Sequence, residues 1–542
     1  MAHRSAALKL AFLSLARASG TATLAVVFVS VSVGLAIFAA TYRSTLSRND
    51  ADRAAFQVPL DYTLKPDPGR RPEGEPVGPA YATRFGAVPV VRLQGEAPSL
   101  GHRGVTLLGL PAGDLSRLRW RRDFASDSPR TLAKRIGGPP VSLRGARIPP
   151  GARELRLPVT IHGDPINLSA SVQARDGRFL VLDLGEPPND GRSVARARIP
   201  PEGRGGLLVG LVVEFSRSEA FTAAHRETGT PAPIAIFRRG LLELGAPTVT
   251  GGRRLAVDYR DWVGPRGARP TGGKPGSLAL RYFLTENQVF RLRPAQPTDG
   301  APIPVVASSS IARAAGSNAV LPLFVGTTPV NVRIAASAHR FPTTIGDFVV
   351  ADRSRLETAL NSTVPGSALA EEAWVSGGRG LAARLESGPV RVTSRRTVEN
   401  DLRSDPLARG TLLVFAAAAL AALVLSIVGL ALTVAVDLRD EDGELFDLET
   451  QGVGPSGLRR QVALRAGVVG AAGLVGGVLI GLALALIVLD AIAVSANSTE
   501  PVPPLQLAAD WPSLLIGIVV FGLAAAAVVA LLTRGSFREE AA

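Results

Sequence analysis

Four long stretches without a charged residue or histidine constrain this chain more than any other feature of its sequence. They run from Ala18 to Tyr42, Gly410 to Val436, Ala466 to Leu489 and Trp511 to Thr533. An apolar helix needs about 20 residues to cross the hydrocarbon core of a bilayer, and each stretch is longer than that. The first stretch also exceeds the roughly 7–15 residues of a signal-peptide core. We therefore expect four retained transmembrane helices, at 18–42, 410–436, 466–489 and 511–533.

The basic residues beside these stretches predict the orientation of the chain. Nine lysines and arginines lie in the N-terminal tail 1–17, the loop 437–465 and the C-terminal tail 534–542, whereas the loop 490–510 has none. Short basic flanks remain on the cytoplasmic side of a membrane. Both termini and the 437–465 loop are thus expected in the cytoplasm, and residues 43–409 and 490–510 outside it.

The large region 43–409 carries strand patterns. Apolar residues alternate with polar ones from Leu155 to Ile161 and from Ile166 to Val172, and Asp176-Gly177 is a two-residue turn before another apolar segment. Short apolar strands are also expected at 105–110 and 330–334. The predicted fold is an α-helical membrane protein with four transmembrane helices and a large extracytoplasmic α+β domain, which contains an inserted β-sandwich at about 145–260.

Enzyme chemistry is not evident in the sequence. The chain has no cysteine and five scattered histidines, which excludes thiolate sites and offers no helical metal-binding spacing. The segment Gly272-Gly273-Lys274-Pro275 lacks the spacing and the Ser or Thr of a phosphate-binding loop. The apolar stretches have no ionisable group, which disfavours an ion-coupled carrier. We expect a non-enzymatic chain with no catalytic residue, metal or cofactor of its own and no nucleic-acid partner.

The third apolar stretch contains a regular glycine pattern. Gly473, Gly477 and Gly481 recur every four residues, so they line one face of a helix. Small residues at this spacing allow another helix to approach closely inside a membrane. The pattern predicts a helix-packing face, although general Gly and Ala richness of the chain explains it equally well.

The 437–465 loop has two short segments separated by Gly454-Pro455. Acidic residues begin the first segment, Leu445 and Leu448 lie on one helical face, and basic residues lead into the third span. Such a surface helix can bind a soluble partner. An ordinary solvated loop is the open alternative.

The layout of one span, a large outer domain and three further spans resembles the FtsX-like and MacB-like permeases of ABC transporters. The residues that carry the resemblance lie in the loop and are Glu444, Leu445, Leu448, Gly452, Leu458, Arg459 and Arg460. The stretch 7–11 also looks like part of the amphipathic elbow helix of that family, and we expect this helix at 1–17. Two features depart from the pattern: the acidic run 440–442 and the inserted sandwich. The acidic variant resembles the second half of the ten-span actinobacterial permeases.

The resemblance implies a permease subunit in a bacterial plasma membrane. A cytoplasmic ABC ATPase would bind ATP, dock on the 437–465 coupling loop and pass its motion to the extracytoplasmic domain for export, extraction or activation of an envelope substrate. A second permease subunit, identical or different, would complete the membrane part. The competing hypothesis is a membrane-anchored extracytoplasmic glycan- or lipid-binding protein or sensor. Neither the substrate nor a ligand of the sandwich follows from the sequence.

Overall fold

A computed structural model describes residues 19–67, 69, 76–101, 103–189, 191–216, 237–264, 276–286, 288–440, 455–495 and 502–536. The chain forms two compact units. The helical unit comprises Met1–Ala54 and Arg396–Ala542, and the β-rich unit comprises Ala55–Arg395. The expected elbow helix at 1–17 lies outside the described residues.

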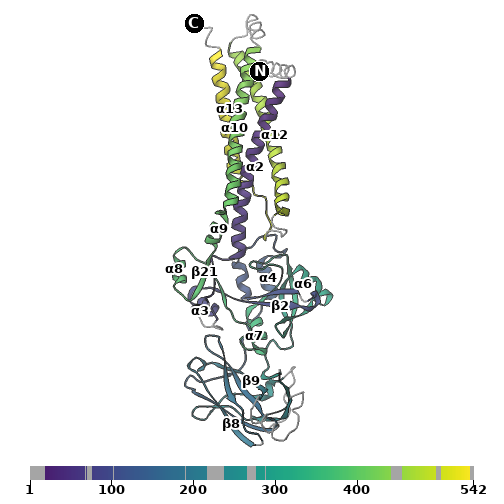
Figure 1. The fold of residues 1–542 in the computed structure, drawn as a ribbon, viewed down its shortest axis with the longest axis vertical. Coiled ribbons are helices and arrows are strands. Elements are labelled where there is room, and N and C mark those ends of the chain that lie inside the picture. The colour runs from purple at the N-terminus through teal and green to yellow at the C-terminus, as the bar shows by residue number, and fades with distance from the viewer. Residues whose placement is uncertain are drawn as a thin grey trace, which may run out of the picture. The chain divides into compact units, whose positions relative to one another are not determined.

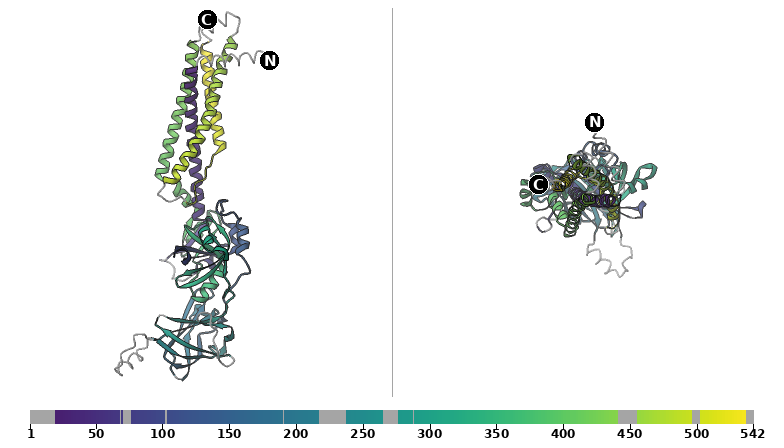
Figure 2. Two further views of the ribbon diagram at one scale, coloured as in Figure 1. Left: turned by 90° about the vertical axis from the view of Figure 1, so that its right-hand side faces the viewer. Right: turned by 90° about the horizontal axis from the view of Figure 1, so that it is seen from above.

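Four long helices form the helical unit and run side by side (Figures 1 and 2). They are α2 (Ser19–Gln57), α10 (Pro406–Asp440), α12 (Pro455–Ser495) and α13 (Trp511–Ser536). All four are long and apolar enough to cross a membrane, with mean hydropathy between 2.4 and 2.9 in their candidate spans. A shorter helix, α9 (Arg395–Arg403), precedes α10.

The helices are longer than the apolar stretches that predicted them. The first stretch ends at Tyr42, whereas α2 continues to Gln57. Extending an existing helix by one residue costs far less than starting one, so the polar residues after Tyr42 can continue it. The expected domain limits of 43 and 409 therefore differ from the unit boundaries, which lie after Ala54 and after Arg395.

A nine-stranded mixed sheet forms one part of the β-rich unit, in the order β17-β18-β16-β19-β3-β2-β20-β1-β21. The pairs β16–β18 and β19–β3 are parallel, and the other neighbours are antiparallel. The strands are β1 (Tyr62–Pro66), β2 (Val88–Ala97), β3 (Arg103–Leu110), β16 (Ile303–Ser308), β17 (Val320–Val325), β18 (Thr328–Ala338), β19 (Asp347–Asp352), β20 (Glu372–Val375) and β21 (Val390–Ser394).

Helices cover both faces of this sheet, which explains why its central strands are continuously apolar. Leu107 of β3 packs in a core with Leu356 of α7, whereas the adjacent Leu108 packs in the opposite core with Leu132 of α4. The expected strands at 105–110 and 330–334 thus lie within β3 and β18. The helices of this unit are α3 (Gly78–Phe85), α4 (Pro129–Ile136), α6 (Ser309–Ala314), α7 (Arg353–Thr363) and α8 (Gly380–Glu386), with 3-10 turns η1 (Pro98–Leu100), η2 (Ala112–Arg117), η3 (Pro201–Gly203), η4 (Tyr259–Asp261) and η6 (Gly316–Asn318).

Two six-stranded sheets form a β-sandwich around a common apolar core. The first, here called the β8 sheet, contains β5 (Glu154–Gly163), β8 (Gly191–Arg198), β10 (Phe237–Leu244), β11 (Thr248–Val249), β12 (Arg253–Arg254) and β14 (Leu278–Thr285). The second, the β9 sheet, contains β4 (Ala146–Arg147), β6 (Ile166–Gln173), β7 (Phe179–Gly185), β9 (Leu207–Phe215), β13 (Trp262–Val263) and β15 (Val289–Pro294).

The sandwich extends beyond the boundary expected near residue 260. The strand β14 pairs with β10, and β15 pairs with β9, so the module continues to Pro294. The Gly- and Pro-rich segment 264–276 lies between strands of the same module and does not mark its end. Pairing between strands that are distant in sequence leaves no local signal, which is why composition misplaced this limit.

Candidate functional site

The glycine face of α12 lies against α2 within the helical unit. A Cβ atom placed on Gly473 would lie 2.6 Å from the Cβ of Val29, and one placed on Gly477 would lie 2.6 Å from the Cβ of Val33. At Gly481 the nearest atom would be the carbonyl oxygen of Gly34, at 2.8 Å. Ordinary carbon contacts are about 3.5–4.0 Å. Any side chain at these positions would therefore push the two helices apart.

Further contacts of α2 reach the other parts of the helical unit. The ring of Phe415 in α10 packs edge-on against Phe38 and Tyr42, with centroid distances of 5.3 and 5.4 Å. The Thr45 hydroxyl accepts a hydrogen bond from the Ala508 N–H at 3.1 Å, immediately before α13. Ser44 donates another hydrogen bond to the Ala508 carbonyl. Side chains of α2 thus contact α10, α12 and the segment that leads into α13.

The predicted docking loop is only partly described. Glu444, Leu445, Leu448 and Gly452 lie outside the described residues. Leu458, Arg459 and Arg460 lie in the first turns of α12, which begins at Pro455. Proline suits the first turn of a helix because the N–H groups there have no partner within the helix.

Inside the β-rich unit, α2 ends in a packed environment. The buried ring of Phe56 packs edge-on against Phe124 at 5.7 Å, and its carbonyl accepts a hydrogen bond from the Thr343 N–H at 2.8 Å. The following residues Val58 and Leu60 are also buried. The last turn of α2 is therefore fixed in this unit.

The two ends of the β-rich unit are tied to each other, and we call this tie the neck. Strands β1 and β21 pair antiparallel, and just beyond them the Arg395 guanidinium donates to the Asp61 carboxylate at 3.0 Å. The Arg395 N–H donates to the Asp61 carbonyl, also at 3.0 Å. The chain therefore enters this unit after α2 and leaves it toward α9 at neighbouring points.

The Asp61 carboxylate is the centre of the neck. Its partial burial alone would raise its pKa, but the Gly377 N–H and the Arg395 guanidinium outweigh this and hold the pKa below the usual value. The Gly377 N–H lies 2.9 Å from the second carboxylate oxygen. Asp61 therefore remains ionised at neutral pH.

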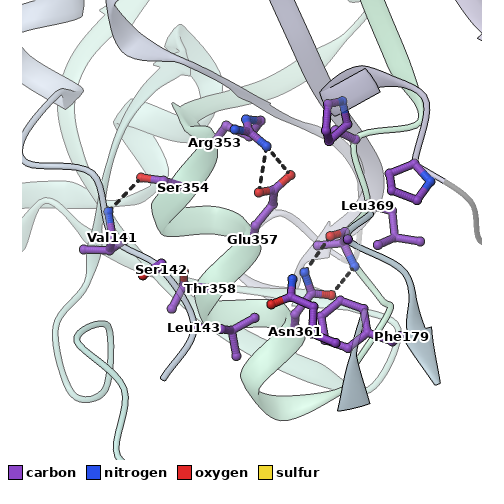
Figure 3. A pocket seen from close by; sticks show the side chains of 16 residues that line it. Val141, Ser142, Leu143, Phe179, Arg353, Ser354, Glu357, Thr358, Asn361 and Leu369 are labelled. Atoms are coloured by element: carbon purple, nitrogen blue, oxygen red, sulfur yellow. Dashed lines mark hydrogen bonds and ion pairs between the residues drawn. The ribbon is translucent and has the colours of Figure 1, made fainter. Parts of the chain in front are cut away.

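A pocket of about 270 Å³ lies in the β-rich unit, between α7 and the β6–β7 turn of the sandwich (Figure 3). Both Glu357 oxygens accept from the Arg353 guanidinium at 2.9 Å. Burial raises the pKa of Glu357, and Arg353 only partly opposes this effect. Asn361, also on α7, accepts hydrogen bonds from the N–H groups of Gly366 and Ala368, at 3.1 and 3.0 Å. These bonds fix the chain that follows α7 against the pocket.

Among the described residues, no group of three or more His, Cys, Asp or Glu side chains could hold a metal ion. Sequence reasoning missed the neck and the Thr45 contact. Asp61 and Arg395 are 334 positions apart, and neither belongs to a local motif that would predict a role. The only sequence signal for Asp61 and Arg395 is that each lies where the chain changes between strand and long helix, at an end of the β-rich unit.

A search of curated proteins found no match to this chain. Residues 416–540 match the family model described as FtsX-like permease C-terminal. This segment includes most of α10 and all of α12 and α13. FtsX-like permeases are non-enzymatic transport components that work with a cytoplasmic ABC ATPase. Over residues 416–540, this chain is therefore similar to the C-terminal part of FtsX-like permeases, and its four apolar helices are consistent with a permease.

Proposed function

We propose that the chain is the permease subunit of an ABC transporter that transmits the motion of a partner ATPase to the β-rich unit outside the membrane. The neck is the observation that carries this proposal. Because α2 is fixed by Phe56 at one end and Arg395 is held by Asp61 at the other, a relative movement of α2 and α10 acts on two paired strands. A tie of this kind transmits force better than two flexible linkers.

The contacts inside the helical unit support the same role. The close approach of α12 to α2 at Gly473, Gly477 and Gly481 means that α2 follows a movement of α12. Because α12 starts next to the predicted docking loop, a partner that binds the loop would act on α12 first. The ATPase contact is assigned to Glu444, Leu445, Leu448, Gly452 and the first turns of α12.

A second permease subunit is the proposed partner within the membrane. A groove of about 630 Å³ lies on the helical unit between α12 and α13. Gly467, Gly470 and Gly522 line it, and a Cβ atom at any of these three positions would meet nothing within 4 Å. A groove of small residues favours a neighbouring helix over lipid chains alone.

Purification of the chain from its native membrane tests the proposal. A cytoplasmic ABC ATPase should co-purify, and the complex should hydrolyse ATP. If none does, the chain is better explained as a membrane-anchored binding protein.

The neck can be tested in the same complex. Asp61→Asn removes one carboxylate charge from the tie and should preserve ATPase binding while reducing the ATP-dependent change of the β-rich unit. A fluorophore on an introduced cysteine, Arg379→Cys, reports that change, since the chain has no other cysteine and Arg379 is exposed. Asp299→Asn is the matched control, because Asp299 pairs with Arg293 of the sandwich strand β15 at 2.8 Å. Equal signals from both variants would contradict force transmission through Asp61.

A further inference from the structure

The outer face of the β8 sheet is rich in arginine. Along each strand, one set of residues points into the sandwich core and the alternate set points outward. In β8 the inward residues are Ala195 and Ala197, which belong to the core, and the outward residues include Arg192, Arg196 and Arg198, all exposed. Three arginines therefore lie on one face of a single strand.

Neighbouring strands extend this basic face. Arg156 of β5 is directly opposite Arg196 of β8, and on its other side it is opposite Thr248 of β11. Thr248 is in turn opposite Arg254 of β12. Because directly paired residues point to the same side of a sheet, Arg254, Arg156 and Arg196 form a row across the strands.

The opposite edge of the same face combines arginine with exposed aromatic rings. Phe283 of β14 is directly opposite Arg239 of β10, and its ring stacks on that of Phe237 with a centroid distance of 5.1 Å. Phe283 remains 55% exposed. Arg281 lies two residues earlier on the same side of β14. Across the sheet it is opposite Leu241 of β10, which is opposite His162 of β5.

Few acids balance these charges. Among the described outward residues of the face, seven arginines accompany two glutamates, Glu154 and Glu243, which leaves a formal excess of five positive charges. Glu154 pairs with Arg156 at 2.5 Å. Like charges on adjacent strands are unfavourable unless they are solvated or neutralised by a partner. Such a concentration of arginine is consequently a candidate surface for an anionic ligand.

We propose that the outer face of the β8 sheet binds an acidic polysaccharide. Arginine forms bidentate hydrogen bonds with carboxylates, and an exposed aromatic ring presents a flat surface to the apolar side of a sugar ring. The strand β5 has ten residues, so the face is about 33 Å long at about 3.3 Å per residue. A linear chain of several sugars can lie along it, and Thr160 and Thr248 add hydroxyl groups between the arginines.

This proposal concerns the sandwich alone and does not depend on an ATPase partner. A membrane surface is the main competing anionic partner. The arginines are interspersed with hydroxyl groups across the face, and its exposed apolar side chains are Val194 of β8 and the Phe237–Phe283 pair at one edge. This distribution favours a polymer that follows the face over a bilayer that takes up apolar side chains.

The test uses the full-length protein in neutral detergent and a fluorescent oligogalacturonate at physiological ionic strength. The triple variant Arg192→Gln, Arg196→Gln and Arg198→Gln should weaken binding about tenfold or more, since each exposed ion pair contributes a modest amount. The control removes three exposed arginines of the nine-stranded part, Arg333→Gln, Arg379→Gln and Arg391→Gln. It changes the net charge equally and should alter the affinity by less than about twofold.

A second variant separates sugar recognition from simple charge attraction. Phe283→Ala should weaken oligogalacturonate binding by about three- to tenfold and leave polyglutamate binding unchanged. Vesicles that contain phosphatidylglycerol should bind more weakly than the oligosaccharide. The proposal is overturned by absence of oligogalacturonate binding, by equal loss in both triple variants, by a silent Phe283→Ala variant, or by tighter binding of the vesicles.

Discussion

The contact between α12 and α2 can be tested by adding a single methyl group. In Gly477→Ala the new Cβ atom would lie 2.6 Å from the Cβ of Val33 and 3.0 Å from the carbonyl oxygen of Ser30. Since carbon atoms normally approach to about 3.5–4.0 Å, the helices would have to separate by about 1 Å. Overpacking of this kind costs about 1–3 kcal/mol.

Gly517→Ala is the matched control on the neighbouring helix α13. A Cβ atom at Gly517 would meet nothing within 4 Å. Replacing glycine by alanine favours a helix by about 1 kcal/mol, and this contribution is common to both variants. The difference between the two therefore isolates the contact with α2.

The free energy of unfolding of the purified protein, measured by SDS titration in mixed micelles, gives the comparison. Gly477→Ala should be less stable than Gly517→Ala by about 1–3 kcal/mol. Equal stability of the two variants would mean that the glycine pattern reflects composition and that α2 and α12 do not pack closely.

Three further predictions concern orientation, docking and pH. In intact cells, an impermeant thiol reagent should label Ser498→Cys and not Ser456→Cys, and labelling at Ser456 would reverse the orientation and remove the docking loop from the cytoplasm. Replacing both Leu445 and Leu448 by Asp should leave membrane insertion normal and weaken ATPase binding by about 2–4 kcal/mol; co-purification at the wild-type ratio would contradict the docking role. Burial raises the pKa of Glu357 above its ordinary 4.5, so the folded chain binds the Glu357 proton more tightly than the unfolded chain. The stability that this proton contributes is lost as the pH rises from 4.5 through the raised pKa. Glu357→Gln should remove that part of the pH dependence, and parallel pH curves for the two proteins would show that Glu357 does not cause it.

Local patterns in the sequence were sufficient for the elements that depend on local physics. An uncharged apolar stretch longer than about 20 residues favours a helix, because every backbone group must find a hydrogen-bond partner inside lipid. From Ser19 on, the first stretch lies within α2, and the other three stretches lie within α10, α12 and α13. Alternation from Leu155 to Ile161 likewise predicted a strand with one buried face, and β5 has that pattern.

Tertiary structure alone decided which distant segments meet. The glycines of α12 predicted a close helix contact but not its partner, and only the packed helices place them against Val29, Val33 and Gly34 of α2. The pairing of β14 and β15 with earlier strands moved the limit of the sandwich to Pro294. The Asp61–Arg395 tie joins residues 334 positions apart. Hydrophobic periodicity records which side of an element is buried, whereas the choice of partner depends on the shape and hydrogen-bonding groups of the whole fold.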